Sequence, residues 1–297
     1  TREDMDFDVS FLKEHNINAV RTSHYPNHTY FYELSDRCGF YLMDEACLES
    51  HGSFGTAEGS RCELSLPADN PEWETICLNK LLRMYERDKN HPSIILWSLG
   101  NESGCGETFF RMREALKIRN PDVLIHYEQG YEDETYMKVS DVYSSMYMPA
   151  AKVSGFIENS HTDKPYILCE YAHAMGNSLG DLDSYRTLLM KYPTFQGGFV
   201  WDYIDQGLMT EHYSGRRMLC YGGDFLEKPN DHDFCCNGIL LADRKRAYQS
   251  SKANTLKYYY QPIACELRED SVLIRNRYLF RDTSHLAFVL EVLADGR

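Results

Sequence analysis

The sequence lacks any apolar run long enough to cross a membrane. A transmembrane helix needs about 20 consecutive apolar residues, whereas the longest apolar stretches here lie around residues 94–99 and 286–293. The first four residues, Thr-Arg-Glu-Asp, also lack the apolar segment of a signal peptide. We therefore expect neither membrane insertion nor export.

Basic residues are scarce as well. The chain of 297 residues holds 31 lysines and arginines against 45 aspartates and glutamates, which gives a formal net charge of −14. Nucleic-acid backbones are bound by clustered basic side chains, so we expect no nucleic-acid partner and favour a neutral or cationic ligand. Hydrophobic residues make up 43% of the chain, which is enough for the full core of a globular protein.

No Cys-x-x-Cys pair occurs among the ten cysteines, and several of them lie inside apolar runs. That paired spacing is typical of zinc sites and redox sites. We interpret the cysteines mostly as buried thiols in a reducing compartment rather than as a disulfide framework. The sequence therefore predicts a cytoplasmic protein.

Strand and helix patterns alternate through the first 200 residues. Strands are predicted over 17–23, 40–43, 94–99, 123–126, 141–145, 166–169 and 197–201, and helices over 1–15, 30–38, 71–90, 107–119 and 181–191. Strands joined by helices form parallel β/α units, so we predict an α/β fold, the (β/α)8 TIM barrel. The chain begins on the helix that would follow the first strand. We therefore expect the first strand to lie before Thr1, in a longer protein of which this chain is an internal piece.

The pattern changes after residue 201. A loop-rich stretch over 202–246 is followed by a predicted helix over 247–259 and by short predicted strands over 263–267, 271–277 and 286–293. We therefore predict two domains. Residues 1–260 form the N-terminally truncated barrel, and residues 261–297 begin an all-β sandwich.

Two glutamates follow strongly apolar predicted strands. Glu102 comes shortly after 94–99, and Glu170 comes directly after 166–169. Active groups of TIM barrels lie at the carboxyl ends of the strands. Glycoside cleavage uses two carboxyl groups, one to protonate the leaving oxygen and one to attack or to activate water. This pair predicts a glycosidase.

Other polar and aromatic side chains fall at the same predicted strand ends, and each alone also suits a capping or loop residue. The full set is His24, Glu45, Glu49, His51, Asn101, Glu102, Tyr127, Glu170, His173 and Trp201. Asn101 suits a hydrogen bond to the 2-hydroxyl of a sugar. Trp201 suits either a sugar ring or the core.

Three patterns raise the question of a metal. Glu170 and His173 form a Glu-x-x-His, but a di-iron site needs two copies on helices. His24 and His28 have the spacing of a zinc-protease pair, but Pro26 between them prevents a shared helix face. Glu49 and His51 offer half of a metal site that a third ligand such as Glu102 would complete, although the two residues taken alone are more typical of a solvated loop.

Longer motifs identify a family resemblance. These are Ser-His-Tyr-Pro-Asn-His at 23–28, Asp-Glu-Ala at 44–46, Glu-Ser-His-Gly at 49–52, Trp-Ser-Leu-Gly-Asn-Glu-Ser-Gly at 97–104, Cys-Glu-Tyr-Ala-His-Ala-Met-Gly-Asn-Ser at 169–178 and Gly-Gly-Phe-Val-Trp-Asp at 197–202. Over about residues 1–260, and in the same order, the chain resembles the catalytic barrel of the large bacterial β-galactosidases of glycoside hydrolase family 2.

The resemblance implies a retaining hydrolase of terminal β-D-galactosides such as lactose. Glu170 matches the nucleophile that forms a covalent galactosyl-enzyme, and Glu102 matches the acid/base. The family is homo-oligomeric at full length, so the resemblance also implies self-association. Two alternatives stay open, namely a β-glucuronidase or β-mannosidase of the same family and a non-catalytic carbohydrate-binding barrel.

The resemblance also implies two cations and a set of sugar contacts. Glu49, His51 and Glu102 match magnesium ligands, while the Phe234 carbonyl and Asn237 match a sodium site. The positions that match sugar-contacting or nucleophile-supporting residues are His24, Asn101, Tyr127, His173, Trp201 and Asn237.

Overall fold

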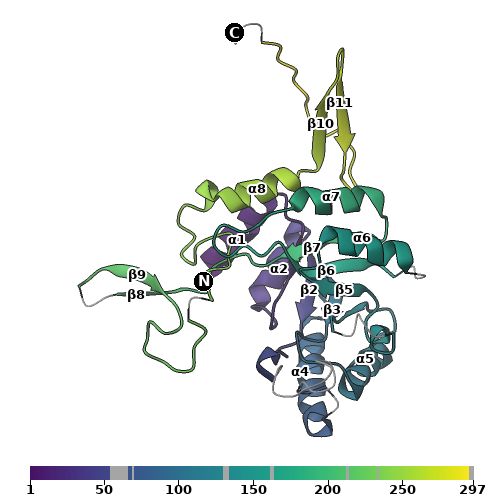
Figure 1. The fold of residues 1–297 in the computed structure, drawn as a ribbon, viewed down its shortest axis with the longest axis vertical. Coiled ribbons are helices and arrows are strands. Elements are labelled where there is room, and N and C mark those ends of the chain that lie inside the picture. The colour runs from purple at the N-terminus through teal and green to yellow at the C-terminus, as the bar shows by residue number, and fades with distance from the viewer. Residues whose placement is uncertain are drawn as a thin grey trace.

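The computed structural model describes residues 1–53, 66–68, 70–129, 134–160, 164–211, 214–232 and 234–293. Seven parallel strands lie at its centre (Figure 1). They are β1 (Ala19–Arg21), β2 (Tyr41–Glu45), β3 (Ile94–Ser98), β4 (Ile125–His126), β5 (Tyr143–Met146), β6 (Tyr166–Tyr171) and β7 (Phe195–Val200). They pair in chain order as two sheets, β1-β2-β3-β4 and β5-β6-β7.

Helices connect these strands and surround them (Figure 1). They are α1 (Arg2–Glu14), α2 (Thr29–Cys38), α4 (Pro71–Asp88), α5 (Glu107–Arg119), α6 (Ala150–Asn159), α7 (Leu182–Lys191) and α8 (Ser251–Tyr259), with short 3-10 turns η1 (His51–Ser53), η2 (Tyr136–Lys138) and η3 (Ala247–Gln249). Neighbouring parallel strands joined by helices are the units of a TIM barrel. The predicted fold class is confirmed.

Local signals in the sequence set the helix ends. The Thr1 hydroxyl accepts from the Asp4 N–H while the Asp4 carboxylate accepts from the Thr1 amine, which is a capping box at the start of α1. Asn70 caps α4, and Pro71 occupies its first turn. Helix α2 ends at Gly39, whose φ of 70° is a left-handed conformation that favours glycine.

The core lies mainly between the strands and the helices. One cluster packs α4 and α5 on β3 and β4, and its members include Leu81, Trp97, Phe109, Met112, Leu116 and Ile125. A second packs α1, α6, α7 and α8 on β6 and β7, with Phe11, Val153, Leu168, Leu188, Phe195 and Leu256. A smaller cluster inside the barrel contains Met43, Leu96 and Val142. Side chains alternate along a strand, so Trp97 faces the helices while Leu96 and Ser98 face the interior.

Two parts of the fold, helix α6 and the β8–β9 hairpin, were not predicted from the sequence. Helix α6 begins after Pro149 without a side-chain cap, and Gly155 and Ser154 in its middle lower its intrinsic helix propensity, so the pattern gave no helix signal. The segment predicted as loop over 202–246 contains an antiparallel hairpin, β8 (Leu208–Glu211) with β9 (Arg217–Cys220). This hairpin extends away from the barrel (Figure 1).

The predicted strand over 286–293 is wrong. These residues have no strand conformation, and their apolar side chains are exposed, including Val289 at 82% and Leu290 at 72%. A strand is stabilised by pairing with a neighbour, and the two strands described within residues 250–293, β10 (Ile263–Leu267) and β11 (Val272–Asn276), pair with each other. Their hairpin projects beyond α8 (Figure 1). That it begins a β-sandwich domain stays a prediction.

The cysteines are mostly unpaired, as expected, but fewer are buried than expected. Eight have free thiols, and only Cys77, Cys169 and Cys220 of these are buried. Cys105 is disulfide-bonded. Within the described ranges, no helix combines the length and the apolar composition needed to cross a bilayer.

Candidate active site

A buried arginine joins the ends of several barrel strands. Arg21 is the last residue of β1, and its side chain is 2% exposed. Its Nε and Nη2 donate to Glu45 Oε2 and Oε1 on β2 at 2.7 and 3.1 Å. Its Nη1 donates to Glu170 Oε1 on β6 at 2.8 Å, and its Nη2 donates to Asn101 Oδ1, after β3, at 2.6 Å. One guanidinium therefore holds residues from four strands together.

Glu170 has a donor on each carboxylate oxygen. Arg21 donates to Oε1, and the Tyr147 hydroxyl donates to Oε2 at 2.6 Å. Burial and the charge of Glu170 raise the pKa of Tyr147 above its ordinary range, so the phenol keeps its proton. The Glu170 side chain is only 7% exposed. Its carboxylate is thus fixed in position and paired with a cation.

Glu102 has a different environment. Its side chain is 26% exposed, and its Oε2 lies 2.7 Å from His51 Nδ1. Its backbone has a positive φ of 40°, and its N–H donates to Glu128 Oε1 at 2.7 Å. The structure therefore gives the two predicted catalytic glutamates distinct settings, one buried and one open, linked through Arg21 and Asn101.

Glu45 is the buried counter-charge of the site. Its side chain is fully buried and accepts from Arg21, from His24 Nδ1 at 2.8 Å and from Ser98 Oγ at 2.8 Å. Burial alone would raise its pKa, but the charge of Arg21 and the hydrogen bond from His24 hold the pKa of Glu45 at about 2. Glu45 is therefore an anion that orients Arg21 and His24.

Two of the predicted sugar contacts lie beside Glu170. The His24 ring stacks on Trp201 with a centroid separation of 5.1 Å and an interplanar angle of 20°. His24 Nε2 lies 3.9 Å from Glu170 Oε1 and 3.9 Å from Glu49 Oε2. Both rings are partly exposed. They form an aromatic wall next to the buried carboxylate.

His173 lies beside Tyr147, the donor to Glu170 Oε2, and Phe234 lies next to His173. The His173 ring lies 5.6 Å from the Tyr147 ring and 6.1 Å from the Phe234 ring, both in tilted arrangements. Burial lowers the pKa of His173, which favours the neutral imidazole. A neutral imidazole both donates and accepts hydrogen bonds, as a contact to sugar hydroxyls requires.

Two buried oxygens nearby have no hydrogen-bond partner among the described residues. They are Asn237 Oδ1 and Asp202 Oδ1, and the Asp202 N–H donates to the Asn237 carbonyl at 3.1 Å. Burial raises the pKa of Asp202 to about 7. Unpartnered buried oxygens are costly, so these atoms are suited to a ligand hydroxyl or a cation.

The predicted magnesium ligands lie close to one another. Glu49 Oε1 accepts from the His51 N–H at 2.8 Å, Glu49 Oε2 accepts from the Asn101 amide, and His51 contacts Glu102. The described part of the chain contains no group of three or more His, Cys, Asp or Glu side chains already arranged to hold a metal. The donors are thus adjacent but engaged with each other.

Tyr127 lies elsewhere than the sequence analysis placed it. Its side chain is buried, its ring stacks on Phe109 at 4.2 Å, and its hydroxyl donates to the Gly104 carbonyl at 2.5 Å. The structure therefore assigns Tyr127 to the core rather than to the sugar contacts. The next residue, Glu128, points the other way and reaches Glu102.

Three site residues were missed by the sequence analysis, namely Arg21, Tyr147 and Glu128. Tyr147 directly follows β5, so the strand-end argument applied to it but the predicted strand was weak. Glu128 is 2% exposed, and burial raises its pKa to about 8. Arg21 gave no signal, because an arginine in a strand is ordinarily exposed.

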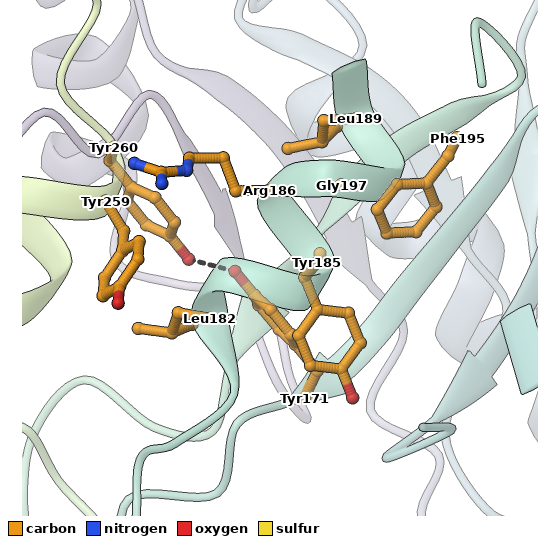
Figure 2. A pocket seen from close by; sticks show the side chains of 10 residues that line it. Tyr171, Leu182, Tyr185, Arg186, Leu189, Phe195, Gly197, Tyr259 and Tyr260 are labelled. Carbon is orange, nitrogen blue, oxygen red and sulfur yellow. Dashed lines mark hydrogen bonds between the residues drawn. The ribbon is translucent and has the colours of Figure 1, made fainter. Parts of the chain in front are cut away.

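A separate small cavity lies outside the barrel, between β6, β7, α7 and α8 (Figure 2). Its volume is about 30 Å³, which is room for about one water molecule. Tyr171 lines it, and its hydroxyl is hydrogen-bonded to that of Tyr260 (Figure 2). Since neighbouring residues of a strand face opposite sides, Tyr171 faces this cavity while Glu170 faces the interior. The cavity is not part of the site.

Comparison with protein families gives a match over most of the chain. The model described as "Glycosyl hydrolases family 2, TIM barrel domain" matches residues 1–265. The β-galactosidase BgaC of Bifidobacterium adolescentis is 45% identical over 303 residues, covering 100% of this chain and 28% of that protein. A β-galactosidase of Clostridium acetobutylicum is 43% identical over 297 residues, covering 100% of this chain and 33% of that protein. The chain thus spans about a third or less of these relatives.

Solved structures share the fold at lower identity. A β-D-glucuronidase of Dictyoglomus thermophilum matches with a TM-score of 0.62 and 20% identity, covering 88% of this chain and 47% of that one. A β-galacturonidase of Eisenbergiella tayi matches with a TM-score of 0.62 and 18% identity, covering 87% of this chain and 47% of that one. At such identities the likeness supports the barrel fold and nothing finer.

Proposed function

The chain belongs to glycosyl hydrolase family 2, and from this membership we propose that it is the catalytic barrel of a retaining β-galactosidase. The observation that carries the proposal is the contrast between the two glutamates. Glu170 is buried, with Arg21 and Tyr147 on its two oxygens, whereas Glu102, the residue after Asn101, is partly exposed. A retaining mechanism needs one fixed nucleophile and one carboxyl that exchanges protons with leaving group and water.

Each group has a defined task in this proposal. Glu170 attacks the anomeric carbon, while Glu102 gives its proton to the glycosidic oxygen as the carbon–oxygen bond breaks. In the second step Glu102 takes a proton from water, the water oxygen bonds to the anomeric carbon, and Glu170 leaves as a carboxylate. Arg21 and Tyr147 stabilise that departing charge, because their hydrogen atoms already point at it. Two displacements retain the configuration.

Charge favours a neutral sugar over a uronate. Arg21 is already occupied by Glu45 and Glu170, and the Glu49 carboxylate lies 3.9 Å from His24 on the same side of the barrel. A glucuronate carboxylate would be repelled here. The relatives at 43–45% identity are named β-galactosidases, which supports galactose further.

The proposal is tested by comparing nitrophenyl galactoside, glucuronide and mannoside as substrates of the protein that contains this chain. We expect kcat/KM for the galactoside to exceed the other two by at least about 100-fold, because a misplaced hydroxyl or a carboxylate leaves buried polar groups unpaired. The same protein with Glu170→Gln serves as a control for contaminating hydrolases. A higher kcat/KM for the glucuronide or mannoside contradicts the galactosidase proposal, and binding of galactose without any turnover supports the non-catalytic alternative.

We further propose that Glu49, His51 and Glu102 hold Mg²⁺. The His51 imidazole contacts the Glu102 carboxylate and the His51 N–H donates to the Glu49 carboxylate, so the three residues are neighbours, and magnesium keeps several water ligands beside one or two carboxylates. His51 would have to exchange its contact with Glu102 for the metal. When bound, the ion supplies a positive charge next to the Glu102 carboxylate.

Calorimetric titration of the chelator-treated protein with MgCl₂ tests this proposal. We expect binding of one ion per chain, and Glu49→Gln to weaken it by at least about tenfold, since a lost ligand costs no less than a lost outer-shell partner. Glu72→Gln, on the exposed start of α4, is the matched control and should bind as the parent does. Unaltered affinity in Glu49→Gln would remove Glu49 from the site.

We also propose that the Phe234 carbonyl and Asn237 bind a sodium ion. The unpartnered Asn237 Oδ1 is a hard oxygen ligand of the kind that sodium accepts. We propose separately that the protein is cytoplasmic. Eight free thiols against one disulfide-bonded cysteine, Cys105, among the described residues favour a reducing compartment.

A further inference from the structure

We infer that Glu128 is a positioning residue for the acid/base Glu102, which it holds by accepting the backbone N–H of that residue. This inference rests on the proposed function. Glu128 Oε1 lies 2.7 Å from the Glu102 nitrogen, and the Glu128 side chain is buried at 2% exposure, with Oε2 unpartnered among the described residues. A carboxyl group in such a place is costly and therefore calls for a specific role.

The segment that carries Glu102 is held at three successive residues. A Cβ on Gly100 would lie 2.8 Å from the Leu48 Cβ and carbonyl oxygen, so the chain passes Leu48 too closely for a side chain. The Asn101 N–H donates to the Leu48 carbonyl at 2.8 Å. The Glu102 N–H then turns away to Glu128. The loop after β2 contacts the first two residues, and Glu128 holds the backbone N–H of the third.

The backbone of Glu102 needs that support. Its φ of 40° is a left-handed conformation that a glutamate adopts only at a cost. This turn, rather than the strand direction, aims the Glu102 side chain, since β3 has already ended at Ser98. Loss of the Glu128 acceptor frees the peptide to rotate and moves the Glu102 carboxyl relative to the glycosidic oxygen. A displacement of about 1 Å at a catalytic group costs up to roughly 100-fold in rate.

The test is the dependence of rate on the leaving group. Glu128→Met removes the acceptor at similar side-chain length, and Glu128→Asp keeps a carboxylate that is too short to reach. We expect both to lower kcat/KM for methyl galactoside by roughly 10- to 100-fold, because alkoxide departure requires the proton of Glu102. For dinitrophenyl galactoside, whose phenolate leaves without protonation, we expect less than about a threefold loss.

Two further variants separate positioning from structural damage. Glu128→Gln retains an acceptor oxygen and should recover most of the rate lost in Glu128→Met. Ser140→Ala removes the hydroxyl that accepts from the Tyr127 N–H at 3.2 Å, one residue before Glu128. This variant should keep the kcat/KM of the parent protein for both substrates. Equal losses for both substrates in Glu128→Met and Glu128→Asp, or no loss in either, overturn the inference. A parent protein that hydrolyses neither substrate instead overturns the proposed function.

Discussion

Changing Glu170 to glycine is expected to reduce hydrolysis of nitrophenyl galactoside by at least about 10³-fold, and added azide is expected to restore turnover with α-galactosyl azide as the product. The space vacated by the carboxylate admits the anion, which attacks the anomeric carbon directly from the same face. A single displacement inverts the configuration. The measurement is the anomeric configuration of the azide product by NMR.

The matched variant is Glu102→Gly, for which azide should give the β-galactosyl azide instead. Here Glu170 still forms the covalent intermediate, and azide takes the place of the water that Glu102 would have activated, so two displacements retain the configuration. Opposite anomers from the two variants assign the two roles separately. The same anomer from both, or an α-product from Glu102→Gly, would mean that the roles are wrongly assigned.

Changing Arg21 to methionine is expected to have the largest effect on stability. The substitution leaves the buried carboxylates of Glu45 and Glu170 without their cation, and breaking a buried ion pair by removing one partner costs about 3–5 kcal/mol. It also removes a hydrogen-bond donor to the Glu170 carboxylate, which leaves the sugar in the second step. We expect this loss to lower kcat by a further factor of about 10² to 10³. Urea unfolding and steady-state kinetics measure the two effects.

The stability loss should depend on pH in a defined direction. The pKa of Glu45 is lowered from its usual 4.5 to about 2 in the folded chain. A lowered pKa stabilises the fold above the unfolded value, and this contribution is lost as pH falls through the folded value. The difference in unfolding free energy between the parent and Arg21→Met should therefore be largest above about pH 5 and shrink as the pH falls from 4.5 toward 2.

Arg113→Met is the control for this experiment. Arg113 pairs with Asp141 at 2.5 Å, but the two side chains are 25% and 18% exposed, so solvent screens the pair and its loss should be smaller. A comparable loss in both variants, or a loss in Arg21→Met that is independent of pH, would contradict the role assigned to the Arg21 and Glu45 pair.

Much of the fold was predictable because its signals are local. Apolar periodicity, the Thr1 capping box, Pro71 and Gly39 each depend on residues close in sequence, and the corresponding helices appear with ends near those predicted. The apolar run over 286–293 has the same local signal but no described neighbour to pair with. A local pattern predicts which secondary structure a segment can form, but a strand forms only where a neighbouring strand pairs with it.

The sequence predicts which strand ends carry the site residues, but not which side chains contact one another there. Strand ends pointed to Glu102, Glu170 and their neighbours, because barrel geometry brings such ends together. Tyr127 and Glu128 both follow β4, yet they face opposite sides, and a side-chain direction that alternates with every residue cannot be read where a strand of two residues ends. Arg21 could not be predicted, since its burial depends on carboxylates supplied by distant strands.

The contact between Arg21 and Glu170 spans 149 positions of the chain, and this separation affects how the protein folds. Until β1 and β6 have come together, Arg21 and Glu45 have no complete set of partners. Their desolvation on burial then costs more free energy than their mutual attraction contributes. Partly assembled barrels are therefore penalised relative to the closed one. Because contacts this distant in sequence form slowly, we expect catalytic competence to arise in the last stage of folding.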